Sequence, residues 1–79
     1  MSESSKKLLS MLLVMGAQVP ERALSASELA QKLGTDPTSV ESDLRKLLET
    51  SFVATSVVSG GRGFYLTGIG VIAASSTYS

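Results

Sequence analysis

The chain has 79 residues, enough for one small domain; a chain of this size buries only about 60% of its unfolded surface on folding. Hydrophobic residues make up 43% and charged residues 18%, so the composition is globular and excludes a disordered chain. Seven basic and seven acidic residues cancel. That balance disfavours a general nucleic-acid coat protein, but it allows a regulator with one positive face.

The sequence contains neither cysteine nor histidine. Their absence removes disulfides, the usual zinc sites, thiol nucleophiles and histidine acid–base chemistry. The stretch "GGRG" lacks the glycine spacing and the following Lys-Ser/Thr of a phosphate-binding loop. No Ser–Lys pair stands at a spacing known for nucleophilic catalysis. We therefore expect no enzyme activity, no metal ion and no cofactor.

Residues 5 to 17 predict a first helix after a frayed start, and this helix is apolar on every side. A helix that is apolar all round must be buried all round, and so short a chain has little material to wrap it. We therefore expect a partner surface, most simply a second copy of the chain. The alternative is a helix with one apolar face left exposed. The homodimer interface would combine this helix with the C-terminal segment, through Leu9, Met11, Leu13, Val14, Ile69 and Ile72.

The segment "KKLLSMLLVMGA" also has the positive start, the short apolar run and the small residues of a secretory signal. We favour a structural helix, because removing the segment would take the first helix from the domain. The run is too short to span a membrane. We expect a cytoplasmic protein, and the lack of cysteine fits a reducing compartment.

A second helix is predicted at residues 26 to 33. Ser25 and Glu28 form a capping box at its start, and Gly34 ends it. Leu24, just before the cap, is a candidate for a very short strand.

A third helix is predicted at residues 37 to 50, with Asp36 as its cap and Pro37 at its first position. Helical spacing gives it one buried stripe, formed by Val40, Leu44, Leu47 and Leu48. Its outward side chains would be Thr38, Ser39, Glu41, Ser42, Arg45, Lys46 and Glu49.

After Ser51 the spacing of the hydrophobic residues changes from that of a helix to that of β-strands. The runs "FVATSVVS" and "GFYLT" are rich in Val, Thr and aromatic residues, and "GGRG" separates them. This pattern predicts a β-hairpin over residues 52 to 67 with a glycine tip. Thr67 is a candidate cap for a last short helix at residues 68 to 75.

The order of helix, helix, turn, helix, hairpin and short helix resembles the winged helix-turn-helix superfamily, in particular small regulators of the MarR and ArsR type. Three stretches carry the resemblance: "LSASELAQKLG", "DPTSVESDLRKLLETSFV" and "GRGFYLTGIG". The resemblance implies an α+β fold, a three-helix bundle with a β-hairpin wing and a short C-terminal helix, as a single domain over residues 1 to 79.

The resemblance also implies a partner, double-stranded DNA, with the third helix in the major groove and the wing at the minor groove or backbone. By position, the candidates facing bases are Thr38, Ser39, Glu41, Ser42 and Arg45. Lys32 and Lys46 would contact phosphates, and Arg62 at the wing tip suits a narrow minor groove.

The sequence departs from the family at residues 41 to 43, where Glu-Ser-Asp replaces a run resembling Ser-Arg-His. Glutamate can accept from cytosine, but it repels phosphates. In the alternative interpretation, which involves no contact with DNA, Glu41 and Asp43 are ordinary surface acids, and Glu41 and Arg45 form a solvated ion pair. In the same interpretation Arg62 only solubilises a flexible turn, and Tyr65 packs in the core or the wing and is not a stacking platform for bases.

Two functions follow from these observations. The first is a homodimeric DNA-binding regulator of transcription, in which dimerisation compensates for few phosphate contacts in each chain. The second is a protein–protein interaction module on the same fold, a subunit of a larger assembly with little affinity for DNA.

Overall fold

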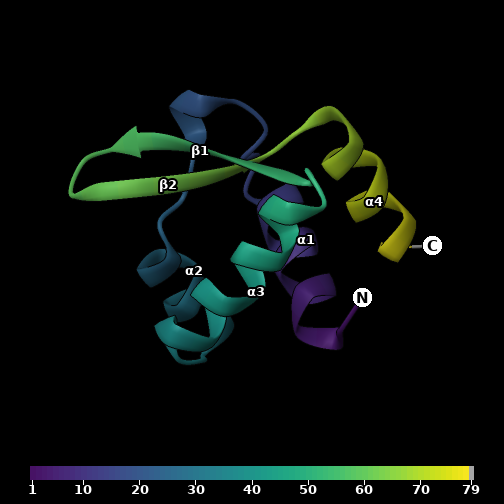
Figure 1. The fold of residues 1–79 in the computed structure, drawn as a ribbon, viewed down its shortest axis with the longest axis horizontal. Coiled ribbons are helices and arrows are strands. Elements are labelled where there is room, and N and C mark those ends of the chain that lie inside the picture. The colour runs from purple at the N-terminus through teal and green to yellow at the C-terminus, as the bar shows by residue number, and fades with distance from the viewer. Residues whose placement is uncertain (79) are drawn as a thin grey trace.

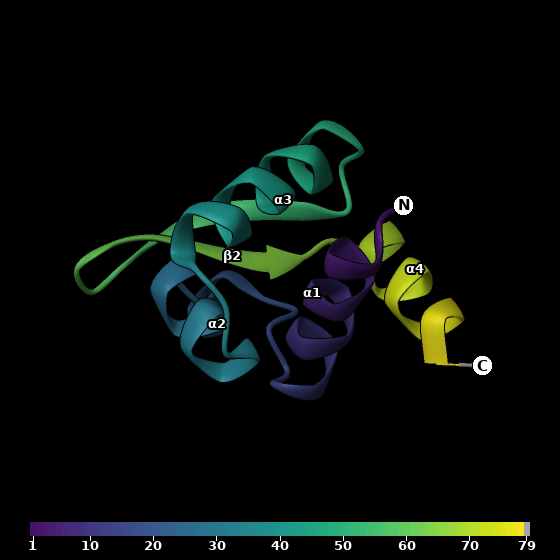
Figure 2. The ribbon, with the colours of Figure 1, turned by 90° about the horizontal axis from the view of Figure 1, so that it is seen from below.

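The computed structural model describes residues 1 to 78 and contains four α-helices, one short 3-10 turn and one two-stranded sheet (Figure 1). Its Cα extents are 34 × 24 × 22 Å. The hairpin reaches out at one end of the long axis and α4 lies at the other, in both views (Figures 1 and 2). In chain order the elements are α1 (Glu3–Val14), η1 (Pro20–Arg22), α2 (Ala26–Leu33), α3 (Pro37–Glu49), β1 (Val53–Val58), β2 (Gly61–Leu66) and α4 (Gly68–Tyr78).

Helix α1 begins two residues earlier and ends three residues earlier than the sequence predicts. It begins at Glu3 because Ser2 caps it: the Ser5 amide donates to Ser2 Oγ at 3.2 Å. It ends at Val14 because Gly16 has a φ of +73°, which reverses the chain. The predicted frayed start at residues 1 to 4 is therefore wrong for Glu3 and Ser4.

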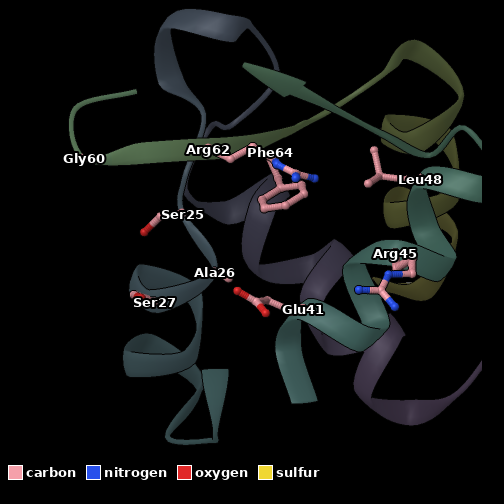
Figure 3. Close-up of a pocket in the computed structure, with 9 residues that line it drawn as sticks. All are labelled: Ser25, Ala26, Ser27, Glu41, Arg45, Leu48, Gly60, Arg62 and Phe64. Carbon is pink, nitrogen blue, oxygen red and sulfur yellow. The ribbon is translucent and has the colours of Figure 1, made fainter. Parts of the chain in front are cut away.

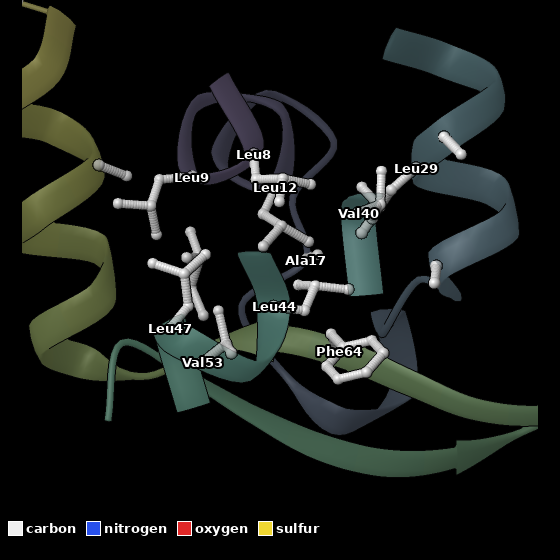
Figure 4. Close-up of a cluster of buried hydrophobic side chains, with 14 residues drawn as sticks. Leu8, Leu9, Leu12, Ala17, Leu29, Val40, Leu44, Leu47, Val53 and Phe64 are labelled. Atoms are coloured by element: carbon white, nitrogen blue, oxygen red, sulfur yellow. The ribbon is translucent and has the colours of Figure 1, made fainter. Parts of the chain in front are cut away.

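The hydrophobic core lies where α1, α2 and α3 meet the sheet (Figure 4). Leu8 and Leu12 from α1 and Leu44 from α3 have no exposed surface. The predicted stripe of α3 faces this core, although Leu48 is only partly buried. Phe64 reaches the core from β2 and is 6% exposed. The core thus fixes the outward face of α3 and the direction of the hairpin together.

Helix α4 covers much of the apolar surface of α1, which corrects the prediction for Leu9. Figure 4 shows the Leu9 side chain pointing toward α4, and this side chain has no exposed surface. Leu9 therefore cannot belong to a dimer interface. Met11 and Leu13 are partly buried and pack against the core, whereas Val14 is 67% exposed. The C-terminal helix explains why most of α1 needs no second chain.

Strands β1 and β2 form an antiparallel hairpin in which Val53 pairs with Leu66 and Val57 pairs with Arg62. The predicted short strand at Leu24 is confirmed as a bridge to Phe64. The Leu24 amide donates to the Phe64 carbonyl at 2.9 Å, and the Phe64 amide donates to the Leu24 carbonyl at 2.8 Å. This bridge ties the base of the wing to the start of α2.

Thr67 links the wing, the end of α3 and α4. The Gly70 amide donates to Thr67 Oγ1 at 3.1 Å, so Thr67 occupies the capping position predicted for it. The Thr67 hydroxyl donates to the Ser51 carbonyl at 2.6 Å. Helix α4 extends to Tyr78, three residues beyond the predicted end at residue 75.

Candidate nucleic-acid interface

An open groove of about 440 Å³ runs between α3, the start of α2 and the wing (Figure 3). Each element contributes for a local reason: the buried stripe of α3 turns its polar face outward, the bridge at Leu24 sets the start of α2, and the hairpin register sets the wing. The groove is lined by Ser25, Ala26, Ser27, Glu41, Arg45, Leu48, Gly60, Arg62 and Phe64.

The start of α2 brings the positive end of a helix dipole to this groove. The predicted capping box is present: the Glu28 amide donates to Ser25 Oγ at 3.1 Å, and the Ser25 amide donates to Glu28 Oε1 at 3.2 Å. The box fixes the first turn of α2, where backbone amides have no partner within the helix. A helix start of this kind favours phosphate oxygens.

Arg62 lies on the inner side of the wing and not at its extreme tip. Its guanidinium carbon is 6.0 Å from the centre of the Phe64 ring, within the range of a cation–π contact. Its cross-strand partner Val57 is 92% exposed. The wing therefore presents one cation and one apolar side chain beside each other, and Phe64 restrains the cation.

Arg45 and Glu41 come from the outward face of α3, and both side chains are exposed. They do not form the ion pair that helical spacing allows. Within residues 1 to 78, the structure shows one ion pair, between Lys6 and Glu3 at 3.7 Å. Glu41 reaches toward the start of α2 in Figure 3, where the helix dipole favours a carboxylate. Arg45 therefore keeps an unpaired guanidinium in the groove.

The other predicted contact residues are not in this groove. Thr38, Ser39 and Ser42 line a separate hollow on the opposite flank of α3, beside the first turns of α1. Lys46 lines a small apolar hollow next to Met1 and Phe52. Lys32 is exposed in the last turn of α2, at the far end from the capping box. The groove thus gathers Glu41, Arg45 and Arg62 from the predicted set.

Asp43 is not the surface acid that the sequence suggested. Its side chain faces inward on α3 and the residue is only 9% exposed. The helical spacing places it beside the buried stripe, between Val40 and Leu47 in sequence, and α1 covers that flank. The acidic run at residues 41 to 43 therefore contributes one carboxylate to the groove, from Glu41.

The groove also contains residues that sequence reasoning did not assign to it. Ser25 and Ser27 belong to the capping region, which the sequence marks only as a helix start. Phe64 is the aromatic residue beneath Arg62, whereas Tyr65 is partly buried against the core. Alternation along β2 separates these two aromatic residues onto opposite faces, so the hairpin pattern contained a signal for Phe64.

Of the predicted interface residues, Val14, Ile69 and Ile72 are exposed, by 67%, 51% and 67%. They lie on α1 and α4, away from the wing (Figure 2). Within residues 1 to 78 there is no helix long and apolar enough to cross a membrane. The same part of the chain holds no group of three or more acidic, His or Cys side chains arranged to bind a metal ion.

Comparison with solved structures decides the fold. The chain superposes on TubR from Bacillus megaterium pBM400 with a TM-score of 0.82, over 92% of this chain and 81% of TubR, at 23% sequence identity. It superposes on MepR from Staphylococcus aureus with a TM-score of 0.85, over 99% of this chain and 56% of MepR, at 16% identity. The chain has a winged helix-turn-helix fold.

The fold resemblance expected from the sequence is confirmed by these superpositions. A mutant of MepR, Q18P, superposes equally well, with a TM-score of 0.86 over the whole chain at 17% identity. MepR is a transcription regulator of the multidrug efflux pump MepA, and this chain spans little more than half of its length. No protein-family profile and no curated protein matches the chain by sequence.

Proposed function

We propose that this protein binds double-stranded DNA as a homodimer and regulates transcription. Helix α3 enters the major groove, and the wing contacts the adjacent backbone or minor groove. The observation that supports this function best is the groove itself. It combines the unpaired Arg45, the restrained Arg62 and the start of α2 beside the exposed face of α3.

The contacts within this groove are few. Arg45 and Arg62 supply two cations in each chain, and Glu41 offsets part of their charge. A single chain that neutralises about two phosphates binds DNA weakly and with a shallow dependence on salt. Two chains double the number of contacts and read two half-sites about one helical turn apart.

The second part of the proposal is that the protein forms a homodimer. Val14 on α1 and Ile69 and Ile72 on α4 support it, because each is large, apolar and at least half exposed. The wing extends away from α4, so a contact through these helices would leave both grooves open (Figures 1 and 2). MepR, with its similar fold, is a transcription regulator, and this likeness supports the regulatory role.

Glu41 favours a second candidate, a protein–protein interaction module. A carboxylate in the groove repels phosphates, and the chain as a whole carries no net charge. In this alternative the groove would dock a segment of another protein, and affinity for DNA would be small.

Fluorescence anisotropy with a random duplex of about 30 base pairs distinguishes the two functions, because this length holds both half-sites. The titration is repeated at several salt concentrations, and light scattering gives the mass of the protein in the same buffer. The regulator predicts saturable binding by a dimer, with log affinity falling linearly against log salt. The interaction module would be favoured if the protein bound neither random duplex nor duplexes selected from a random pool at the lowest salt.

A further inference from the structure

A second hollow lies between α3 and the first turns of α1, on the flank of α3 that faces away from the wing. Its volume is about 710 Å³, within the range of roughly 300 to 1,000 Å³ that is common for small-ligand sites. Part of its wall is apolar, and Ser and Thr side chains also line it. The apolar residues are Leu8, Leu33 and Val40, and the charged ones are Glu3, Lys7 and Asp43.

Asp43 is the unusual member of this lining. It is more than nine-tenths buried, yet it accepts no hydrogen bond and forms no ion pair with any of residues 1 to 78. In that part of the chain, every side-chain nitrogen or oxygen that is fully enclosed has a hydrogen-bond partner. Because the Asp43 carboxylate has no such partner, its oxygens keep access to solvent through the hollow. The carboxylate therefore lines the hollow without a partner from the protein, and a bound cation would supply one.

We propose that this hollow binds a small organic cation, with an ammonium group against Asp43 and a short apolar body against Leu8, Leu33 and Val40. Hydrogen bonds from an ammonium group to a carboxylate are charge-assisted and stronger than neutral ones. The nearby hydroxyl groups, among them those of Ser39 and Ser42, supply further acceptors for the remaining ammonium protons.

Two other charged residues line the hollow and would affect its affinity for the cation. Glu3 adds a second carboxylate to the lining, but it already lies 3.7 Å from Lys6 Nζ. Lys7 is exposed and lines the same hollow without pairing with Asp43. Lys7 is therefore the ammonium group of the chain itself that would compete with a ligand for Asp43.

Binding of such a cation is independent of the proposed function, so it is tested without DNA. The probe is butylammonium, followed by two-dimensional amide NMR of the complete chain, with 1-butanol as the neutral probe of similar shape. We expect saturable shifts at residues 3 to 8 and 38 to 43 with butylammonium, and weaker, unsaturated shifts with butanol.

The substitution Asp43→Asn keeps the shape of the side chain and removes its charge. We expect it to weaken butylammonium binding by about tenfold or more, the loss of one charge-assisted hydrogen bond. Glu49→Gln makes the same change of charge at the exposed end of α3, outside the hollow, and should leave the affinity unchanged. Amide spectra with the dispersion of the natural protein show that each variant is folded.

Three results would overturn the proposal: equal shifts with butanol, equal affinity after Asp43→Asn, or no saturable binding to the natural protein. A Lys7→Ala variant completes the experiment, since it should bind butylammonium at least as tightly as the natural protein. Binding by Lys7→Ala alone would make Lys7 the partner of Asp43 in solution and would also reject the proposed site.

Discussion

The guanidinium carbon of Arg62 lies 6.0 Å from the centre of the Phe64 ring, two residues along the same strand. Phe64 is almost fully buried and belongs to the hydrophobic core, so it gives Arg62 a fixed support. A cation–π contact at an exposed site stabilises by about 0.5–1 kcal/mol. The contact restrains the arginine on the inner side of the wing, facing the groove with α3 (Figure 3).

The first prediction concerns Arg62 and DNA. Arg62→Ala should weaken binding by about tenfold at low salt and should reduce the salt slope of a dimer by about 2, one unit for each chain. Anisotropy titrations at several salt concentrations measure both quantities.

Lys6→Ala is the matched control for Arg62, because it removes an exposed positive charge from α1, outside the groove. Its slope should stay close to that of the natural protein. If the natural protein and Arg62→Ala had equal salt slopes, the wing would not contact the DNA backbone.

The second prediction concerns Gly70, where α4 meets the end of α3. A Cβ atom added at Gly70 would overlap the carbonyl oxygen of Phe52, which is backbone and cannot move aside. Gly70→Ala should therefore lower the free energy of unfolding by about 2–3 kcal/mol, as overpacking does. Urea denaturation followed by circular dichroism measures this change.

Gly68→Ala provides the comparison on the same helix. A Cβ at Gly68 would meet no atom within 4 Å, so the substitution should be neutral or stabilising by up to about 1 kcal/mol. Equal stabilities of the two variants would mean that the contact between Gly70 and Phe52 does not hold α4 in place.

Gly70 also shows how far the sequence predicted this structure. The stretch "GRGFYLTGIG" predicted the wing by its resemblance to a family, and the contact with Phe52 gives the physical reason for the last glycine. Local signals predicted the starts of α2, α3 and α4 well, because the capping of Ser25, Asp36 and Thr67 is determined by neighbours in sequence.

Contacts between distant segments could not be predicted in the same way. Periodicity showed that α1 is apolar all round, but not that α4 from the other end of the chain covers Leu9. For the same reason Asp43 was expected on the surface, because the sequence does not show that α1 lies along that flank of α3. The position of Arg62 beside Phe64 follows from the period of two along β2, so the sequence could predict it once the strand was assigned.

The third prediction separates dimerisation from folding. Ile72 is 67% exposed, so Ile72→Ser should weaken the dimer while leaving the stability of the single chain within about 0.5 kcal/mol. Sedimentation equilibrium measures the dimer constant. Leu9→Ala should instead destabilise the fold itself by about 2–5 kcal/mol, because Leu9 is enclosed within one chain.

Val57→Ser is the control for Ile72, since it removes an exposed apolar side chain from the wing, at the other end of the molecule. It should leave the dimer constant unchanged. A dimer that responds to Val57→Ser and not to Ile72→Ser would place the interface on the wing.

The fourth prediction concerns the start of α2. Ser25→Ala removes the acceptor for the Glu28 amide and should cost about 1 kcal/mol of stability. Ser27→Ala, two residues later on the same exposed turn, removes a hydroxyl that makes no hydrogen bond with residues 1 to 78 and should change stability little. Thermal and urea unfolding of both variants test the cap; equal costs would show that the capping box does not stabilise the helix.

The most direct test of the proposed DNA-binding groove is amide NMR of the protein titrated with a short duplex at low salt. The structure predicts that the shifted amides cluster at residues 25 to 27, 41 to 48 and 60 to 64, around Arg45 and Arg62. Amides on the outer side of α4 should shift little. Shifts concentrated on α1 and α4, or no shifts at a salt concentration where the natural protein is folded, would contradict the assignment of this groove to DNA.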